Sequence, residues 1–386
     1  MDAILMSLMT ALNEKLLINV YQRDTDDFYT GYVQLLGKQS VLLATYNDAG
    51  LADGAVLIAF PAIEQVEFAG DDLVDMSFRM RVAAEHHFIG LTPQKPLAFD
   101  PRQNLLHQLA LHAQTSGEVI LVILADDDSY LEGQVTAVAD DRLTLSVFNK
   151  FNYTDVRYLQ VDFSDVLVVE CEGLELHLET ELLKQRNQLK HVRTEITQND
   201  GQLEALFNEA EQSGQLLAAM PRNAGDQFYV GAVKAVNAVN AETVVLRLKD
   251  MAGQFGGYVA LRLTSIQSVI TASDYLQTVK AYSDWMTAHH LEKQPVLNAD
   301  REFDRSEDLF RSLINEAAAF ERVVRVRVQN ENAHLMGIPE NPDQTGFEIS
   351  VPSEDEPVAV TFDEVQEIAF GHIYAYLQEA RAHQTR

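Results

Sequence analysis

Two pairs of adjacent histidines, His86–His87 and His289–His290, are the residues in this sequence most suited to chemistry. Histidine titrates near neutral pH and is a common metal ligand, so a metal-dependent enzyme is one function to weigh. Each pair follows an isoleucine, Ile63 or Ile266, by 23 residues. Adjacent residues on a helix point about 100° apart, so one pair cannot easily hold a single ion. Both pairs fall where a helix is predicted to end, a favourable place for cations, and we predict a structural role.

Two acidic clusters and one cysteine are weaker candidates. The clusters DDD at 126–128 and EDE at 354–356 lack the alternating spacing of a calcium loop, so solvated loops are expected. Cys171 ends the apolar run VLVVEC and is expected to be a small core or edge residue, not a nucleophile. We predict no catalytic, metal or cofactor-binding residue from these patterns.

A glycine-rich stretch and two aromatic residues also have simple structural explanations. AGQFGGYV, which holds Gly253, Gly256 and Gly257, lies between two predicted strands, so a hairpin turn explains it better than a phosphate cradle. Tyr282 and Trp285 are three residues apart on a predicted helix and are expected to be core residues.

The charge balance restricts the partners. The 386 residues hold 58 acids and 29 bases, a net charge of −29. Such a charge repels polyanions and disfavours bulk binding to nucleic acid or to an anionic membrane. A single cysteine cannot form an intrachain disulfide, which favours the cytoplasm. Residues 1–15 are expected to form a short amphipathic helix and not a signal peptide, and no apolar stretch is long enough for a membrane helix.

An internal repeat gives the architecture. The octapeptide DDFYTGYV at 26–33 returns as DQFYVGAV at 226–233. Its glycine has counterparts in YLEGQV and HLMGIP, and the successive gaps are 102, 98 and 106 residues. The first and third copies are alike, as are the second and fourth, which indicates two successive duplications in the order A-B-A′-B′. The four glycines are Gly31, Gly133, Gly231 and Gly337.

Each copy is predicted to be a helix, about five short strands and a further helix. The domains expected are 1–90, 91–195, 196–295 and 296–386, and the fold class is a β-rich α+β protein. In 100–114 and 304–318 a first aspartate, Asp100 or Asp304, is suited to cap a helix. Leu105 and Leu109 in one helix, and Leu309 and Leu313 in the other, fall on one face.

Within the first copy the strands can be laid out. LLINVYQR and FYTGYVQLL flank the turn DTDD, SVLLATYN and AVLIAF follow, and PAI makes a tight link into QVEFA. A glycine inside a long strand permits the sharp bend that a small barrel needs. This arrangement resembles the Sm-like fold, with about 55 residues per copy. The resemblance implies four five-stranded Sm-like (SH3-like) barrels whose edge strands pair with neighbouring copies in an arc or closed ring. Pro339 and Pro342 predict a shortened strand or a blunted edge in the fourth copy.

The RNA-binding pattern of the Sm-like family is not matched. The resemblance implies an Asp and an Asn near the turn between the second and third strands, and an Arg-Gly pair between the fourth and fifth. The first site reads LGKQS or ADDRL here, and the dipeptide Arg-Gly is absent from the chain. The second site holds Phe60-Pro61, Leu263-Thr264 and Phe362-Asp363 in the first, third and fourth copies.

The third copy differs from the others in charge. Residues 215–270 carry +2, whereas 16–68, 118–172 and 321–370 carry −5, −9 and −8. Docking against acidic neighbours is the simpler explanation, and a local anion or RNA site is the alternative. The five bases of the third copy are Arg222, Lys234, Arg247, Lys249 and Arg262.

These observations favour a cytoplasmic, non-catalytic binding or scaffold protein of tandem Sm-like barrels with an unidentified protein partner. The first alternative is an RNA-associated protein with a residual site on the third barrel. The second is a metal-dependent enzyme that uses the histidine pairs. Intrachain barrel-to-barrel assembly is expected, and a homo-oligomer is an open alternative.

Overall fold

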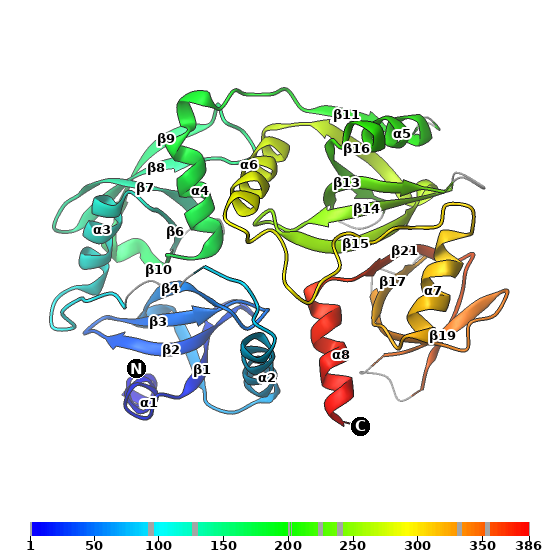
Figure 1. The fold of residues 1–386 in the computed structure, drawn as a ribbon. Helices are drawn as coiled ribbons and strands as arrows, with labels where there is room; N and C mark the ends of the chain where they lie inside the picture. Colours follow the sequence, from blue (N-terminus) through cyan, green and yellow to red (C-terminus); the bar gives the residue numbers. More distant parts are fainter. Residues whose placement is uncertain are drawn as a thin grey trace. The chain divides into compact units, whose positions relative to one another are not determined.

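The computed structural model describes residues 2–91, 96–125, 130–199, 201, 203–222, 227–237, 242–329, 334–351 and 356–385. The chain divides into two compact units, Met1–Lys190 and His191–Arg386 (Figure 1). Within the described residues, the first unit holds an antiparallel sheet of ten strands and the second one of eleven. No described helix is long and apolar enough to cross a membrane. The cluster 126–128 and the first two residues of 354–356 lie outside the described residues.

The first unit contains two successive modules, each a helix followed by five strands. Module 1 is α1 (Asp2–Glu14), β1 (Leu17–Gln22), β2 (Phe28–Leu36), β3 (Ser40–Tyr46), β4 (Ala52–Ala59) and β5 (Ile63–Glu67). Module 2 is α3 (Leu105–Ser116), β6 (Val119–Leu124), β7 (Tyr130–Val138), β8 (Arg142–Phe148), β9 (Val156–Asp162) and β10 (Val166–Cys171). Helices α2 (Asp71–Glu85) and α4 (Leu174–Lys184) follow them.

The second unit repeats this order. Module 3 is α5 (Leu203–Ser213), β12 (Leu216–Pro221), β13 (Tyr229–Val236), β14 (Thr243–Lys249), β15 (Phe255–Arg262) and β16 (Ile266–Ala272). Module 4 is α7 (Leu309–Ala319), β17 (Val324–Val328), β18 (His334–Glu340), β19 (Gly346–Ser350), β20 (Val358–Thr361) and β21 (Val365–Phe370). Helices α6 (Asp274–Ala288) and α8 (Ile373–Thr385) follow them.

All four modules share one strand order, in which the fifth strand pairs with the first and the others follow in sequence. The fourth strand of module 1 also pairs with the fifth strand of module 2, since Leu57 of β4 lies opposite Val169 of β10. Module 3 and module 4 repeat this arrangement, with Ala260 of β15 opposite Ile368 of β21. Each unit is therefore two modules joined edge to edge, and the expected pairing of edge strands within the chain occurs twice.

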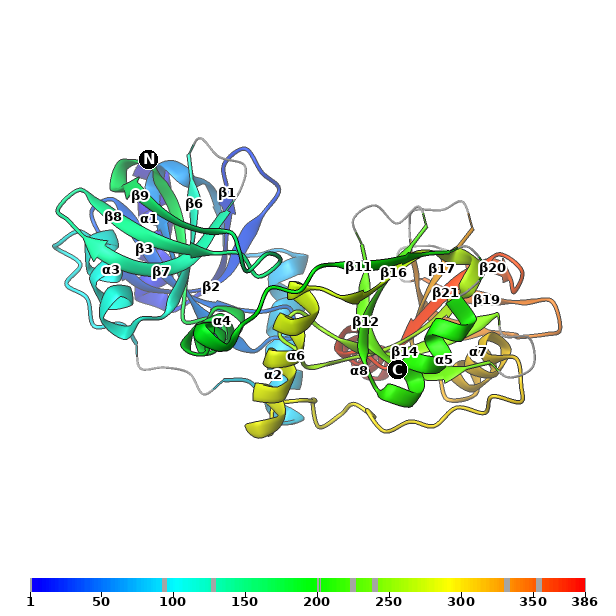
Figure 2. The ribbon, with the colours of Figure 1, turned by 90° about the horizontal axis from the view of Figure 1, so that it is seen from above.

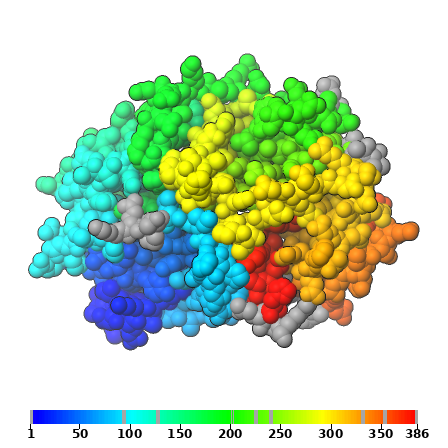
Figure 3. All heavy atoms as spheres, in the orientation of Figure 1, coloured from blue at the N-terminus to red at the C-terminus, as the bar shows by residue number. Residues whose placement is uncertain are grey.

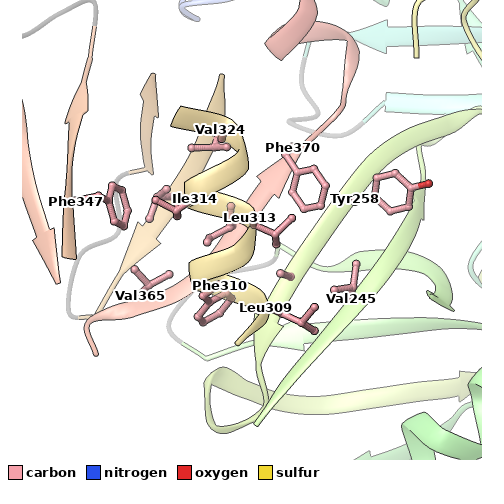
Figure 4. Packing of buried hydrophobic residues seen from close by; sticks show 14 of the residues in the cluster. Val245, Tyr258, Leu309, Phe310, Leu313, Ile314, Val324, Phe347, Val365 and Phe370 are labelled. Atoms are coloured by element: carbon pink, nitrogen blue, oxygen red, sulfur yellow. The ribbon is translucent and has the colours of Figure 1, made fainter. Parts of the chain in front are cut away.

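The helix that leads each module packs against that module's second strand, as α1 does on β2 and α5 on β13. Helix α7 also reaches the preceding module. Its Leu309, Phe310 and Leu313 pack with Val245 and Tyr258 of module 3, while Ile314 packs with Phe347 of module 4 (Figure 4). The leucines predicted to share one face of α3 and of α7 are buried: Leu105, Leu109, Leu309 and Leu313.

The predicted helix caps were wrong by one turn. Asn104, not Asp100, caps α3 by accepting from the backbone amides of Leu106 and His107. Asp308, not Asp304, caps α7 by accepting from the amide of Arg311. Asp100 and Asp304 instead close turns ahead of the helices, where each accepts the amide two residues on. Asp and Asn side chains accept from free backbone amides both in turns and at helix starts, so the residue types alone could not show which position caps the helix.

The four repeated glycines occupy equivalent places on the second strands, β2, β7, β13 and β18. A Cβ atom added to any of them would come within 2.5 Å of a carbonyl oxygen on the third strand. At each glycine the paired third strand comes so close to the second strand that no side chain larger than a hydrogen atom fits at that position. The oxygens belong to Ala44, Ser146, Arg247 and Ser350.

The links and edges of the modules agree in part with the sequence. The tight link before the fifth strand is a 3-10 turn in three modules, at Phe60–Ala62, Phe163–Asp165 and Leu263–Ser265. In module 4 the strand that reaches the prolines, β18, has seven residues in the described part of the chain and ends at Glu340, where β2, β7 and β13 have nine, nine and eight, so the predicted shortening is small. Pro339 itself is accommodated in β18, opposite Ile349.

The sequence 174–192 is typical of one long helix, but the helix is shorter and a strand that the sequence did not indicate follows it. Helix α4 ends at Lys184, a 3-10 turn follows at Arg186–Gln188, and β11 (Glu195–Gln198) pairs with β16 (Figure 2). The pairing occupies the edge of β16 that is not bonded to β12, so that edge is closed to a neighbouring module.

Candidate functional site

The histidine pairs end helices α2 and α6, as predicted. His86 and His289 are the C-cap residues directly after α2 and α6, and His87 and His290 have φ of 55° and 58°. In each case the next amide turns back, from Phe88 to the carbonyl of Ala83 and from Leu291 to that of Met286, both at 2.8 Å. This is a Schellman ending, in which the second histidine takes the left-handed place usually given to glycine.

The first histidine of the second pair has contacts within its own helix. His289 stacks on Trp285, with ring centroids 3.8 Å apart, and its Nδ1 lies 2.8 Å from the Trp285 carbonyl oxygen. Among the described residues, no group of three metal-ligating side chains is close enough to hold an ion. Tyr282 is buried, as expected for core, whereas Trp285 is half-buried beneath His289.

The bases of module 3 mostly contact module 4 and the segment that leads to it. Arg262 donates to the carbonyls of Val365 and Phe362, at 3.0 and 2.9 Å, and lies over the ring of Phe310. Arg247 donates to the carbonyl of Ala299. Lys234 pairs with Glu302 at 2.8 Å. Two remain within module 3, where Arg222 donates to the carbonyl of Thr264 and Lys249 to that of Gly253.

The other sequence candidates have structural positions. Cys171 is buried at the end of β10, and burial raises the pKa of its thiol. Gly253 lies in the turn between β14 and β15, with φ of 76°, so the glycine-rich stretch is a hairpin. Gly253 packs on the backbone of Tyr282 and Ser283 in the middle of α6, but the stretch joins two strands and does not lead into the start of a helix, as a phosphate cradle would.

A buried ionic cluster that the sequence did not suggest joins modules 3 and 4. Its centre is Glu367 of β21, whose side chain is 0% exposed. Arg327 donates to one carboxylate oxygen at 3.0 Å, and the other oxygen lies 3.2 Å from His334 and accepts from the Tyr229 hydroxyl. Burial alone would raise the pKa of Glu367, but these bonds and the nearby arginine charges hold it below its ordinary value. The buried negative charge of Glu367 is thus balanced by the positive charge of Arg327 and by these hydrogen bonds.

Module 2 contains a second buried ionic cluster, and its centre is a lysine instead of a glutamate. Lys150 is 5% exposed and contacts Glu132 at 3.1 Å and Glu175 at 2.6 Å. Glu179 of α4 is buried, and neither of its carboxylate oxygens accepts a hydrogen bond from any described residue. Burial, followed by the charge of Glu132, raises the pKa of Glu179 to about 9. Glu179 is therefore protonated at neutral pH.

Each unit also has a hollow at the joint between its two modules. In the second unit a cavity of about 360 Å³, the joint cavity, lies among residues 296–301, the end of α7 and the start of α8. Figure 3 shows the red surface of α8 bordering the yellow and orange surface of these preceding residues. The first unit has a hollow of about 450 Å³ at the matching place. Gly54 and Gly257 sit beside the two hollows with φ of 71° and 89°.

The walls of the two hollows differ. The joint cavity is walled by Tyr258 and Phe370, whose rings stack 5.5 Å apart. The hollow of the first unit is lined instead by Asp53, Glu172 and His177. Burial raises the pKa of Asp53, although the amide of Leu174 donates to it at 2.7 Å.

His372 is the most unusual polar group of the joint cavity. Its Nδ1 accepts from the amide of Ala375 at 3.1 Å and so begins α8. Burial, with the charge of Arg325, lowers the pKa of His372 to about 4. A neutral ring that accepts at Nδ1 carries its proton on Nε2. That Nε2 is buried and has no partner among the described residues.

Two ion pairs border the same cavity. Arg301 contacts Glu316 at 2.5 Å, and its guanidinium lies 5.1 Å from the centre of the Phe370 ring. Arg322 contacts Glu379 at 2.7 Å. Both carboxylates are therefore already neutralised. The Tyr258 hydroxyl accepts from the Arg301 amide at 3.1 Å, and no described residue accepts its proton.

Sequence reasoning missed these groups for a physical reason. The joint cavity is assembled from residues near 258, 301, 322 and 372, which only the pairing of β15 with β21 brings together. One signal was available for the ionic cluster. VRVRV at 324–328 alternates arginine with valine, which indicates a strand with charge on one face.

Comparison with known proteins identifies no family. No family model matches the chain. No curated protein matches it either. Among solved structures, the four MBT repeats of Drosophila melanogaster Sfmbt, in complex with a peptide, align over 94% of this chain and 89% of that chain at 8% identity. The TM-score is 0.13, so the alignment supports no conclusion about fold or function.

Proposed function

We propose that this chain is a non-catalytic binding or scaffold protein of the cytoplasm, built from four Sm-like modules and acting on protein partners. The observation that carries the protein-binding part is a set of exposed aromatic side chains on module 2. Tyr158 of β9 is 69% exposed, and Tyr130 and Phe151 are each 54% exposed. Large exposed aromatic side chains are typical of protein interfaces.

The strand order supports the Sm-like assignment. In every module the fifth strand lies beside the first, and a lead helix packs on the second strand. The fourth strand of one module joins the fifth strand of the next, which is the pairing that the resemblance implies. Four barrels of this kind remain our proposal for how each five-stranded module is curved.

The position of β9 favours a partner there. It is the last strand of its sheet among the described residues, so one of its edges has no neighbouring strand. An exposed edge next to exposed aromatic side chains can accept a strand or a loop of another protein.

Nucleic acid is the less favoured partner. The net charge of −29 opposes it, and Arg247, Arg262 and Lys234 already bind carbonyl or carboxylate groups of the chain. A residual site on module 3 would have to give up contacts that hold modules 3 and 4 together.

The test is affinity capture from the source organism with the tagged full-length chain and with a triple variant, Tyr130→Ser, Phe151→Ser and Tyr158→Ser. A protein held by the wild type and lost by the triple variant supports the proposal. The matched control replaces two exposed hydrophobic residues elsewhere, Val74→Ser and Met251→Ser, and should retain that protein.

The eluate is also assayed for nucleic acid by its absorbance at about 260 nm. Nucleic acid that is held by the wild type, and lost on charge reversal of Arg247 and Lys249, would overturn the preference for a protein partner. If the triple variant and the control retain the same proteins as the wild type, the aromatic surface of module 2 is not the binding site.

A further inference from the structure

The joint cavity of the second unit has the dimensions and chemistry of a small-molecule site. Its volume of about 360 Å³ lies within the usual range for ligand pockets. Its walls combine apolar and aromatic side chains, including Tyr258, Leu313 and Phe370, with a few polar groups. The cavity lies within one compact unit, so its shape does not depend on how the two units are placed.

The unused polar groups of this cavity are hydrogen-bond donors. The Nε2–H of His372 is buried and has no acceptor among the described residues. The hydroxyl of Tyr258 accepts from the Arg301 amide and has no described acceptor for its own proton. Leaving buried donors without partners is costly, so a ligand or water that accepts from them is favoured.

A cationic ligand fits these walls poorly, even though aromatic rings and carboxylates are present. The guanidinium of Arg301 already lies over Phe370 and Phe303, at 5.1 and 5.2 Å from the ring centres. Glu316 pairs with Arg301, and Glu379 pairs with Arg322 and accepts from the Val323 amide. An incoming cation would have to displace one of these internal cations.

We propose that the joint cavity binds a small aromatic molecule carrying a carbonyl or carboxylate acceptor, with the ring against the apolar wall and the acceptor at the donors of His372 and Tyr258. The site is separate from the aromatic surface of module 2 that we propose for a protein partner. Either proposal can therefore fail without the other.

The test is a titration of the full-length protein with four probes of one size, benzoate, benzamide, benzylamine and toluene, followed by ligand-observed NMR and melting temperature. We expect benzoate or benzamide to bind with a dissociation constant of about 1 mM, the range set by so few atoms. Benzylamine and toluene should bind about tenfold more weakly, because neither offers an acceptor to the buried donors.

Two variants place the binding in the cavity. His372→Asp keeps a side chain that can cap α8 but removes the Nε2–H donor and adds negative charge, so binding should weaken about tenfold or more. Ala375→Leu fills part of the cavity from the buried face of α8 and should reduce binding even if His372→Asp folds poorly.

The matched control is Tyr374→Asp. It places the same charge in the first turn of α8 at an exposed side chain that does not line the cavity. Its affinity should stay within about twofold of the wild type. Benzylamine binding as tightly as benzamide, or probe binding that survives both cavity variants, would overturn the proposal, as would the absence of binding by all four probes.

Discussion

Tyr29 of module 1 donates a 2.6 Å hydrogen bond to Glu170, on the fifth strand of module 2. The repeat of this tyrosine, Tyr229, donates to Glu367 on the fifth strand of module 4. The tyrosine of the duplicated octapeptide thus reaches a carboxylate of the adjoining module in both units. The repeat preserves a contact across the joint as well as a strand pattern.

Replacing Tyr29 by phenylalanine should destabilise the first unit by about 1–3 kcal/mol. No other described residue donates a hydrogen bond to Glu170, so the substitution leaves a partly buried carboxylate unpaired. Urea unfolding followed by circular dichroism measures the effect. Tyr32→Phe is the control, because no described residue bonds the Tyr32 hydroxyl, and equal losses from the two variants would refute the explanation.

Glu367→Gln should cost about 3–5 kcal/mol, because it leaves the buried Arg327 without its counter-charge. The pKa of Glu367 is below its ordinary value, so its contribution is present above the unfolded value near 4.5 and is lost as the pH falls through the folded value. Wild type should therefore lose stability in acid more steeply than the variant. Asp363→Asn, at an exposed neighbour, should change neither quantity.

Glu179→Gln should stabilise the first unit at neutral and alkaline pH. The folded pKa of about 9 exceeds the unfolded one, so the folded state holds a proton that the unfolded state releases. Wild-type stability should fall as the pH rises from about 4.5 to 9, by up to about 1.4 kcal/mol per unit, and the variant should lack this slope. Urea unfolding at pH 6, 7 and 8 measures it. Glu85→Gln, at an exposed position, should retain the wild-type slope; a wild-type stability that does not change with pH would contradict the prediction.

Gly31→Ala should destabilise module 1 severely, by about 3 kcal/mol or more, because the new methyl group meets the carbonyl of Ala44 on β3. A shift of the two strands would relieve the clash only by breaking their hydrogen bonds. Gly90→Ala is the control, since its added carbon would meet only the side chain of Leu51 at ordinary contact distance. Thermal unfolding of the two variants compares them, and a mild effect at Gly31 would mean that the strands cross less closely.

Much of the architecture could be predicted from the sequence, because local signals and the duplication agree. The repeated glycines, the alternating strand patterns and the turn at 60–62 each indicate one element of a module, and the other copies show the same elements in the same order. Element ends were less predictable. Asn104 and Asp308 cap helices that Asp100 and Asp304 could equally have begun.

The candidate site could not be predicted in the same way. Tyr258, Arg301 and His372 are separated by 43 and 71 residues and belong to a strand, a connecting segment and a helix start. Their types are common, and their roles depend on burial and on unused hydrogen bonds. Strand β11 was missed because EITQ is too short to show a period.

Strand β11 has a consequence for self-association. Sheets lengthen between molecules when an exposed edge accepts a strand, and in the second unit β16 already has a strand of the same chain on its outer side. The opposite end of that sheet is the four-residue β20. Strand β11 also has four residues, so both outer strands of this sheet offer a neighbouring molecule few backbone groups to pair with, and extension of the sheet from one molecule to the next is disfavoured in this unit.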